Sequence, residues 1–284
     1  MKGKHNLLLR CFFVGCLFFT CGLSAQSRLL MRMDDMGVSH SVNLACIAAY
    51  QQGIGTAVEV MVTGPWFEEA VQLLNENPDL DVGVHLVLSS EWNHYKWRPL
   101  TACPSLVDET GCFFPMIWPN PAYTAEEALT NHKWRLKEIE QELRAQIELA
   151  LKRIPHISHL SQHMGCLSVH PDAQALYKQL AKDYGLKIAV PDANVKKVPK
   201  WNGSAYSAKE KEKRFLRMLD SLAQDTYMII GHLMKNTPES QALALRGYDN
   251  AALDRSGELK VYQSKRVAKA LKKHNIQLIS YKDL

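Results

Sequence analysis

Short apolar segments alternate with longer amphipathic segments along the chain from residue 26 onward. The short segments are rich in Val, Ile, Leu and Met, which is typical of strands buried inside a sheet. They predict strands at residues 28–33, 57–62, 81–88, 156–160, 187–190, 227–231 and 276–280. The segments between them carry apolar residues with helical periodicity, which predicts helices at residues 39–52, 66–75, 125–153, 172–184, 208–223 and 264–274.

This alternation predicts an α/β fold with a largely parallel sheet. In a chain of 284 residues, the pattern suits a distorted or incomplete TIM-like (β/α) barrel better than two small domains. No linker rich in Ser, Gly or Pro divides the sequence, so we expect one domain over residues 26–284. Two long inserts interrupt the alternation: residues 89–123, which carry several aromatic residues, and residues 191–207, which we expect to be a solvated loop.

Residues 1–25 have the pattern of a secretory signal peptide. Basic residues precede an apolar run at residues 11–20, and Leu23-Ser24-Ala25 is a plausible cleavage site. The run is too short for a mature membrane-spanning helix, so we expect an exported protein, periplasmic or secreted, without stable membrane insertion.

Charge changes the picture of possible partners. Removal of residues 1–25 takes away three positive charges and no negative ones, so the formal net charge falls from +5 to +2. The remaining basic residues are matched by acidic ones rather than pooled, which argues against a nucleic-acid partner. The pattern leaves open whether the chain forms a homodimer.

Four cysteines follow the signal segment: Cys46, Cys103, Cys112 and Cys166. They form no CxxC pair, which argues against a structural zinc site of the cysteine type. In an exported protein a disulfide between Cys103 and Cys112 would close a short loop, and four separate thiols fit the sequence equally well.

The first predicted strand runs directly into Asp34-Asp35-Met36-Gly37. Adjacent side chains of an extended strand point to opposite sides, so one carboxylate can face a metal while the other takes a different task such as proton transfer. Asp and Gly are also common in turns after strands. The position favours function, because barrel active sites lie at the carboxyl ends of the strands.

Histidines occupy equivalent positions on two further predicted strands. His85 lies near the carboxyl end of the strand at 81–88, and His159 and His163 flank the end of the strand at 156–160. One Asp and two His from three strand ends make a donor set suited to zinc or a related divalent ion with open positions for water. We interpret His163 as a ligand and His159 as a supporting residue, because the strand ends before His163.

His232 follows the apolar run 227–231 and is a candidate proton donor, although a histidine that caps a loop fits the sequence as well. No GxSxG, P-loop, GxGxxG or HExxH motif is present. Serine-hydrolase, nucleotide-binding and zincin mechanisms therefore have no support in the sequence.

With these residues the chain resembles the YdjC/ChbG-like carbohydrate deacetylases. The resemblance covers nearly all of the sequence after the signal segment and rests on DDMG at residues 34–37, PDLDVGVHL at 78–86, HLSQHM at 159–164 and IQLISYKDL at 276–284. It implies a distorted TIM-like barrel and a metal-dependent hydrolase that removes acetyl groups from N-acetylated sugars or oligosaccharides.

The resemblance also implies roles for individual residues. Asp35, His85 and His163 would bind one divalent ion, zinc or magnesium, and Asp34 would be the general base. Better-known members carry an Asp two residues before the ligand histidine, where this chain has Ser161. That difference puts metal affinity and substrate in doubt.

A sugar substrate gives the aromatic insert a candidate role. Trp92 and Trp97 offer flat faces on which pyranose rings stack, with Glu91 beside them as a hydrogen-bonding group. The same aromatic residues can instead pack the insert onto the barrel. Three alternatives to N-deacetylation remain: an O-acetyl ester deacetylase, another metal-dependent amidohydrolase, and a carbohydrate-binding protein whose catalytic site has decayed.

Overall fold

The computed structural model describes residues 26–189 and 194–284. Its strands form one sheet with the order β5-β4-β3-β2-β1-β7-β6, in which all neighbours are parallel, and β8 pairs with the start of β1. The strands are β1 (Ser27–Met36), β2 (Ala57–Val60), β3 (Asp81–Leu86), β4 (Ile157–Gln162), β5 (Lys187–Ile188), β6 (Lys196–Lys197), β7 (Thr226–Gly231) and β8 (Ile276–Ile279).

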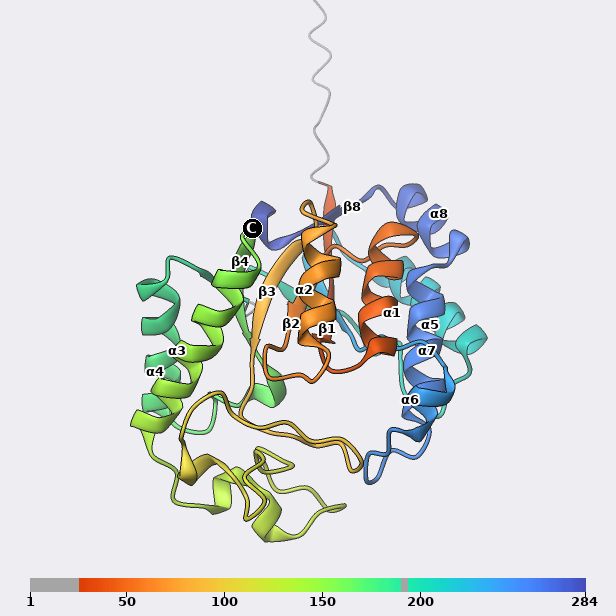
Figure 1. The fold of residues 1–284 in the computed structure, drawn as a ribbon. Coiled ribbons are helices and arrows are strands. Elements are labelled where there is room, and N and C mark those ends of the chain that lie inside the picture. The colour runs from red at the N-terminus through yellow and green to blue at the C-terminus, as the bar shows by residue number, and fades with distance from the viewer. Residues whose placement is uncertain (1–25, 190–193) are drawn as a thin grey trace, which may run out of the picture.

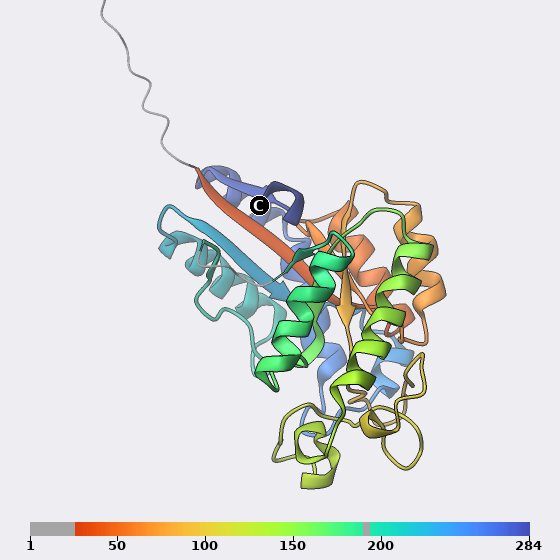
Figure 2. The ribbon, with the colours of Figure 1, turned by 90° about the vertical axis from the view of Figure 1, so that its left-hand side faces the viewer.

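The sheet curls into a half-barrel with helices around its outside (Figures 1 and 2). The helices are α1 (His40–Gln51), α2 (Phe67–Asn75), α3 (Leu136–Arg153), α4 (Pro171–Asp183), α5 (Ala208–Ser221), α6 (Pro238–Ala242), α7 (Ala251–Tyr262) and α8 (Lys265–Lys273). The two-residue strands β5 and β6 lie at opposite ends of the sheet order, and no pairing joins them within the described residues. This arrangement confirms the predicted α/β fold with an incomplete TIM-like barrel.

The central strand β1 is buried along nearly its whole length, because β7 covers one side of it while β8 and then β2 cover the other. Such a strand exposes little of either face to water, which explains the apolar residues Leu29, Leu30, Met31 and Met33 before Asp34. The chain then turns into α1, where the Ser39 side chain caps the helix by accepting the backbone N–H of Val42. The strand therefore delivers its last residues to one end of the half-barrel.

The first insert lies beyond the carboxyl ends of the strands, below the sheet in Figure 1. We predicted a helix over residues 125–153, but α3 begins only at Leu136. Thr124 and Glu127 form a capping box that closes a short 3-10 turn, and Ala128 bridges to Met116 of the insert. The residues before α3 therefore belong to the insert.

Other features of the structure differ from the predictions or extend them. The structure adds α6 and α7, and it places β6 within the segment expected to be a solvated loop. All four described cysteines are free, so Cys103 and Cys112 form no disulfide.

The predicted signal segment and Val190, at the end of a predicted strand, lie outside the described residues. Within residues 26–189 and 194–284, no helix is long and apolar enough to cross a membrane.

Candidate active site

A cavity of about 560 Å³ opens at the carboxyl ends of the strands, a volume typical of sites for small ligands. Its wall combines side chains from strand ends, from the first insert and from α7. The titratable residues that line it are Arg32, Asp34, Asp35, His85, Glu91, His163, Tyr177, Lys197, His232 and Arg255.

Asp34 and Asp35 both line this cavity, although they are neighbours on β1. The pairing of β1 with β2 shifts register between Met33 and Met36, and Asp35 has a φ of +72°, in the left-handed region. An irregularity of this kind re-aims side chains that a regular strand would point apart. The expectation that the two carboxylates face opposite sides is therefore wrong.

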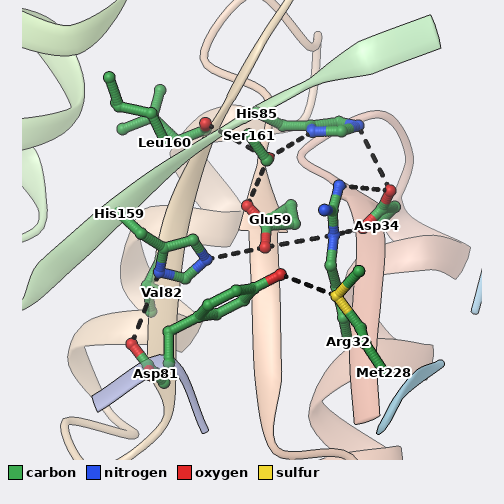
Figure 3. Close-up of polar contacts among 12 residues, drawn as sticks. Arg32, Asp34, Glu59, Asp81, Val82, His85, His159, Leu160, Ser161 and Met228 are labelled. Carbon is green, nitrogen blue, oxygen red and sulfur yellow. Dashed lines mark hydrogen bonds and ion pairs between the residues drawn. The ribbon is translucent and has the colours of Figure 1, made fainter. Parts of the chain in front are cut away.

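Asp34 is held in place by Arg32 from the same strand (Figure 3). The guanidinium donates to both carboxylate oxygens, with Nε–Oδ1 and Nη2–Oδ2 distances of 2.5 and 2.8 Å. Arg32 Nε also lies 3.3 Å from Oε1 of Glu59 on β2. Burial opposes the charge on Arg32, but these two carboxylates hold the pKa of its guanidinium well above the usual value.

Asp35, His85 and His163 converge on one point, with one potential ligand atom from each lying within 4.8 Å of the others. All three residues are buried. Among the residues that the structure describes, Asp35 Oδ1 has no hydrogen-bond partner, although it lies 3.3 Å from His163 Nδ1 and 3.6 Å from His85 Nε2. A buried carboxylate oxygen without a partner beside two imidazole nitrogens fits a divalent cation.

The two histidines of this cluster differ in charge in the metal-free protein. Burial lowers the pKa of His85 to about 4, so its ring is neutral at pH 7. Burial also opposes charge on His163, but the carboxylates of Glu91 and Asp35 on its two sides prevail and raise its pKa to about 10. Burial likewise opposes ionisation of Asp35, yet His163, His232 and Arg255 hold the pKa of its carboxyl well below the usual range.

Glu91 and Arg255 complete the polar wall around this cluster. Glu91 Oε2 lies 3.2 Å from His163 Nε2, so both ring nitrogens of that histidine face carboxylates. Arg255 on α7 donates to Asp35 Oδ2 at 3.2 Å, and its guanidinium lies over the ring of Trp92 at 5.2 Å. The insert and α7 thus contribute directly to the site.

His232 and His159 occupy different positions. His232 lines the cavity and is half-buried at the end of β7. His159 is fully buried behind the cavity, where its Nε2 lies 2.8 Å from Glu59 Oε1 and its ring packs against Tyr281. His159 therefore contacts a residue that supports the wall rather than the cavity itself.

Trp92 and Trp97 are enclosed in the insert, with exposed fractions of only 0% and 2%. Trp97 Nε1 donates to the carbonyl of Ser89 at 2.7 Å, which fixes the indole inside the insert. Neither ring offers a free face to a sugar, so the predicted stacking role is wrong and the packing alternative describes both residues.

The sequence analysis did not assign functions to Arg32, Glu59 and Arg255. A single Glu in the apolar run Ala57-Val58-Glu59-Val60 was a signal, because an unpaired buried carboxylate is too costly to keep without a partner. Arg255 gave no comparable signal, because it lies in a helix whose polar sequence resembles a loop.

The fold and this cluster define a class: parallel half-barrels with an Asp-His-His group at the carboxyl ends of the strands. The family model described as YdjC-like protein matches residues 28–273. The chain therefore belongs to the YdjC-like family.

Several curated relatives of this chain are named carbohydrate deacetylase. A carbohydrate deacetylase of Thermus thermophilus is 39% identical over 173 residues, which cover 61% of this chain but only 56% of that protein. A carbohydrate deacetylase of Clostridium beijerinckii is 29% identical over 269 residues, 90% of this chain and 100% of that protein. The crystal structure of an Enterococcus faecalis protein, described as a candidate cellobiose-phosphate cleavage protein, superimposes with a TM-score of 0.71. It is 23% identical and covers 91% of this chain and 98% of its own, which supports the fold.

Proposed function

We propose that the protein is a metal-dependent carbohydrate deacetylase that acts on N-acetylated sugars or oligosaccharides. The observation that carries this proposal is the cluster of Asp35, His85 and His163, in which Asp35 Oδ1 lacks a partner while a second carboxylate, Asp34, stands beside it. Hydrolysis of an unactivated amide needs both a cation site and an adjacent base. The name shared by the curated relatives agrees with this chemistry.

Asp35, His85 and His163 would hold the ion, either zinc or magnesium. When bound, a divalent ion lowers the pKa of water and polarises the acetyl carbonyl. The mixed oxygen and nitrogen donor set favours zinc over magnesium, since magnesium prefers oxygen ligands alone.

Asp34 is the proposed general base. Its Oδ2 lies 3.7 Å from His85 Nε2, so the carboxylate stands at the edge of the ligand cluster. The two bonds from Arg32 fix the orientation of this carboxylate, so that it can accept the proton of the attacking water. The same bonds keep it from swinging into the position of a ligand.

His232 is the proposed proton donor to the leaving amine. It lines the cavity from β7, and β7 adjoins β1, which carries both aspartates. Transfer of a proton to the nitrogen as the C–N bond breaks yields acetate and a free amino sugar.

Export is a separate part of the proposal. The first described strand begins at Ser27, two residues after the predicted cleavage point, so loss of residues 1–25 would leave the described elements intact. A mature chain of residues 26–284, periplasmic or secreted, is consistent with this placement.

The test is acetate release by the metal-stripped protein from a panel of N- and O-acetylated oligosaccharides, with and without zinc, magnesium or cobalt. We expect release from an N-acetylated member only after a metal is added. Release from O-acetyl esters alone would instead identify an ester deacetylase. Sugar binding with no release under any metal would support the decayed binding protein.

A further inference from the structure

A continuous chain of hydrogen bonds leads from His85 away from the cavity into the sheet (Figure 3). His85 Nδ1 lies 2.7 Å from Ser161 Oγ, and Ser161 Oγ lies 2.5 Å from Glu59 Oε2. The three residues come from the adjacent strands β3, β4 and β2, and each is at most 1% exposed.

Gly83 provides the space for this contact between strands that are not neighbours. It pairs with Glu59 on β2 and with His159 on β4, so it lies between their side chains. A Cβ at this position would approach Glu59 Oε2 to 2.4 Å and His159 Nε2 to 2.3 Å. Only glycine lets the carboxylate cross β3.

The chemistry of the three groups fixes the direction of each hydrogen bond. Glu59 is ionised, because its contacts with His159 and Arg32 outweigh burial and hold the pKa of its carboxyl well below the usual range. An ionised carboxylate only accepts, so Ser161 must donate its single hydroxyl proton to Glu59. The Ser161 oxygen then accepts the Nδ1–H of His85, which leaves the lone pair of Nε2 directed at the cluster with Asp35.

We propose that Glu59 is a positioning residue for the metal site and that it acts through Ser161. The relay holds His85 in the tautomer that presents Nε2 to the ion, and it fixes the plane of the ring. Because Arg32 also contacts Glu59, the same carboxylate anchors the residue that orients Asp34. This proposal rests on the metal site of the proposed function.

The experiment measures the affinity of the metal-stripped, folded protein for zinc by competition with a chromophoric chelator. Ser161→Ala removes the relay and keeps the contacts of Glu59 with His159 and Arg32. We expect its affinity to fall roughly 10- to 100-fold, the usual effect of losing a partner behind a histidine ligand. Glu59→Gln should lower it similarly.

Ser158→Ala is the matched control. Ser158 also lies on β4 and contributes to the same network, where it contacts His159 Nδ1 at 2.7 Å and the Asp81 carboxylate, but it does not contact His85. It should lower stability without lowering zinc affinity. The double variant Glu59→Gln with Ser161→Asp places a carboxylate directly beside His85, and we expect it to recover affinity relative to Glu59→Gln.

A second readout follows the tautomer itself. In the zinc-loaded wild type, ¹⁵N NMR should show His85 protonated at Nδ1, and Ser161→Ala should weaken or exchange-broaden that signal. Unchanged zinc affinity in Ser161→Ala, or an equal loss in Ser158→Ala, would overturn the relay while leaving the metal site standing. A folded wild-type protein that binds no divalent ion would overturn both the relay and the proposed function.

Discussion

Asp34 and Asp35 are chemically identical neighbours that differ in their partners. Asp34 receives two bonds from Arg32, whereas Asp35 has one oxygen on Arg255 and the other without a partner. These contacts support our proposal that the first carboxylate is the base and the second a metal ligand. Environment rather than residue type divides the two tasks.

Asp34→Asn tests this division. We expect turnover to fall by roughly 10²- to 10⁴-fold, the usual contribution of a general base, while zinc affinity stays near that of the wild type because the three ligands remain. His85→Ala should lose both activity and zinc affinity. Full turnover in Asp34→Asn would show that another group accepts the proton.

His163 makes metal binding depend on pH. Its pKa of about 10 in the metal-free protein means that the ring carries a proton at pH 7, and this proton must leave before the nitrogen can bind an ion. Apparent zinc affinity should therefore rise by about tenfold per pH unit between pH 6 and 8, with about one proton released per ion. His85, with a pKa of about 4, is already neutral in this range.

Calorimetry in buffers with different ionisation enthalpies measures the proton release directly. Zinc affinity that does not change with pH, together with no proton release, would contradict the assignment of His163 as a ligand.

Among the elements, the strands other than β6 were predicted because apolar residues recur along them between polar turns, whereas β6 consists of two lysines and carries no such signal. The helix α7 was missed for a physical reason: its residues Asp254, Arg255, Ser256 and Glu258 are polar, yet they are buried in the structure. Such a sequence has the composition of a loop, and only its tertiary partners, such as Lys211 beside Asp254, make its burial favourable.

The site was predictable in part from the positions of its residues along the predicted strands. His85 and His163 stand at strand ends, where position alone indicates function. The irregularity of β1 at Asp35 could not be predicted, because no local sequence rule fixes a left-handed φ at an Asp. In the sequence, Ser161 indicated only that the supporting Asp of better-known family members is missing. Its hydrogen bond to Glu59 could not be predicted, because the bond forms only when β2, β3 and β4 lie side by side.

Gly83→Ala tests the packing of these three strands. A Cβ there would overlap Glu59 and His159, so we expect a loss of roughly 1–3 kcal/mol in the free energy of unfolding and a weaker zinc affinity. Gly185→Ala is the control, because its φ of +64° strains an alanine but no atom lies within 4 Å of the new Cβ. We expect Gly185→Ala to lower the free energy of unfolding by about 1 kcal/mol and to leave the zinc affinity unchanged. Equal zinc affinities in both variants would contradict the role of Gly83.

At the scale of the whole molecule, the half-barrel gathers every proposed catalytic group at one end of the sheet. The opposite end holds the start of β1, so a precursor segment before Ser27 would join the fold away from the cavity. Expression of the full chain in a Gram-negative host should yield periplasmic or secreted protein that begins at Gln26, as measured by intact mass and N-terminal sequencing. Protein retained in the cytoplasm with residues 1–25 attached would contradict export.

We propose that a cation at Asp35, His85 and His163 makes this half-barrel a carbohydrate N-deacetylase. The most direct measurement follows acetate and free amine together while zinc is added back to the metal-stripped protein with N-acetylated oligosaccharides. We expect no product without metal, and equal amounts of acetate and amine once about one ion per chain is bound. Equal rates with and without metal, or a metal-loaded protein that forms neither product from any N-acetylated sugar, would contradict it.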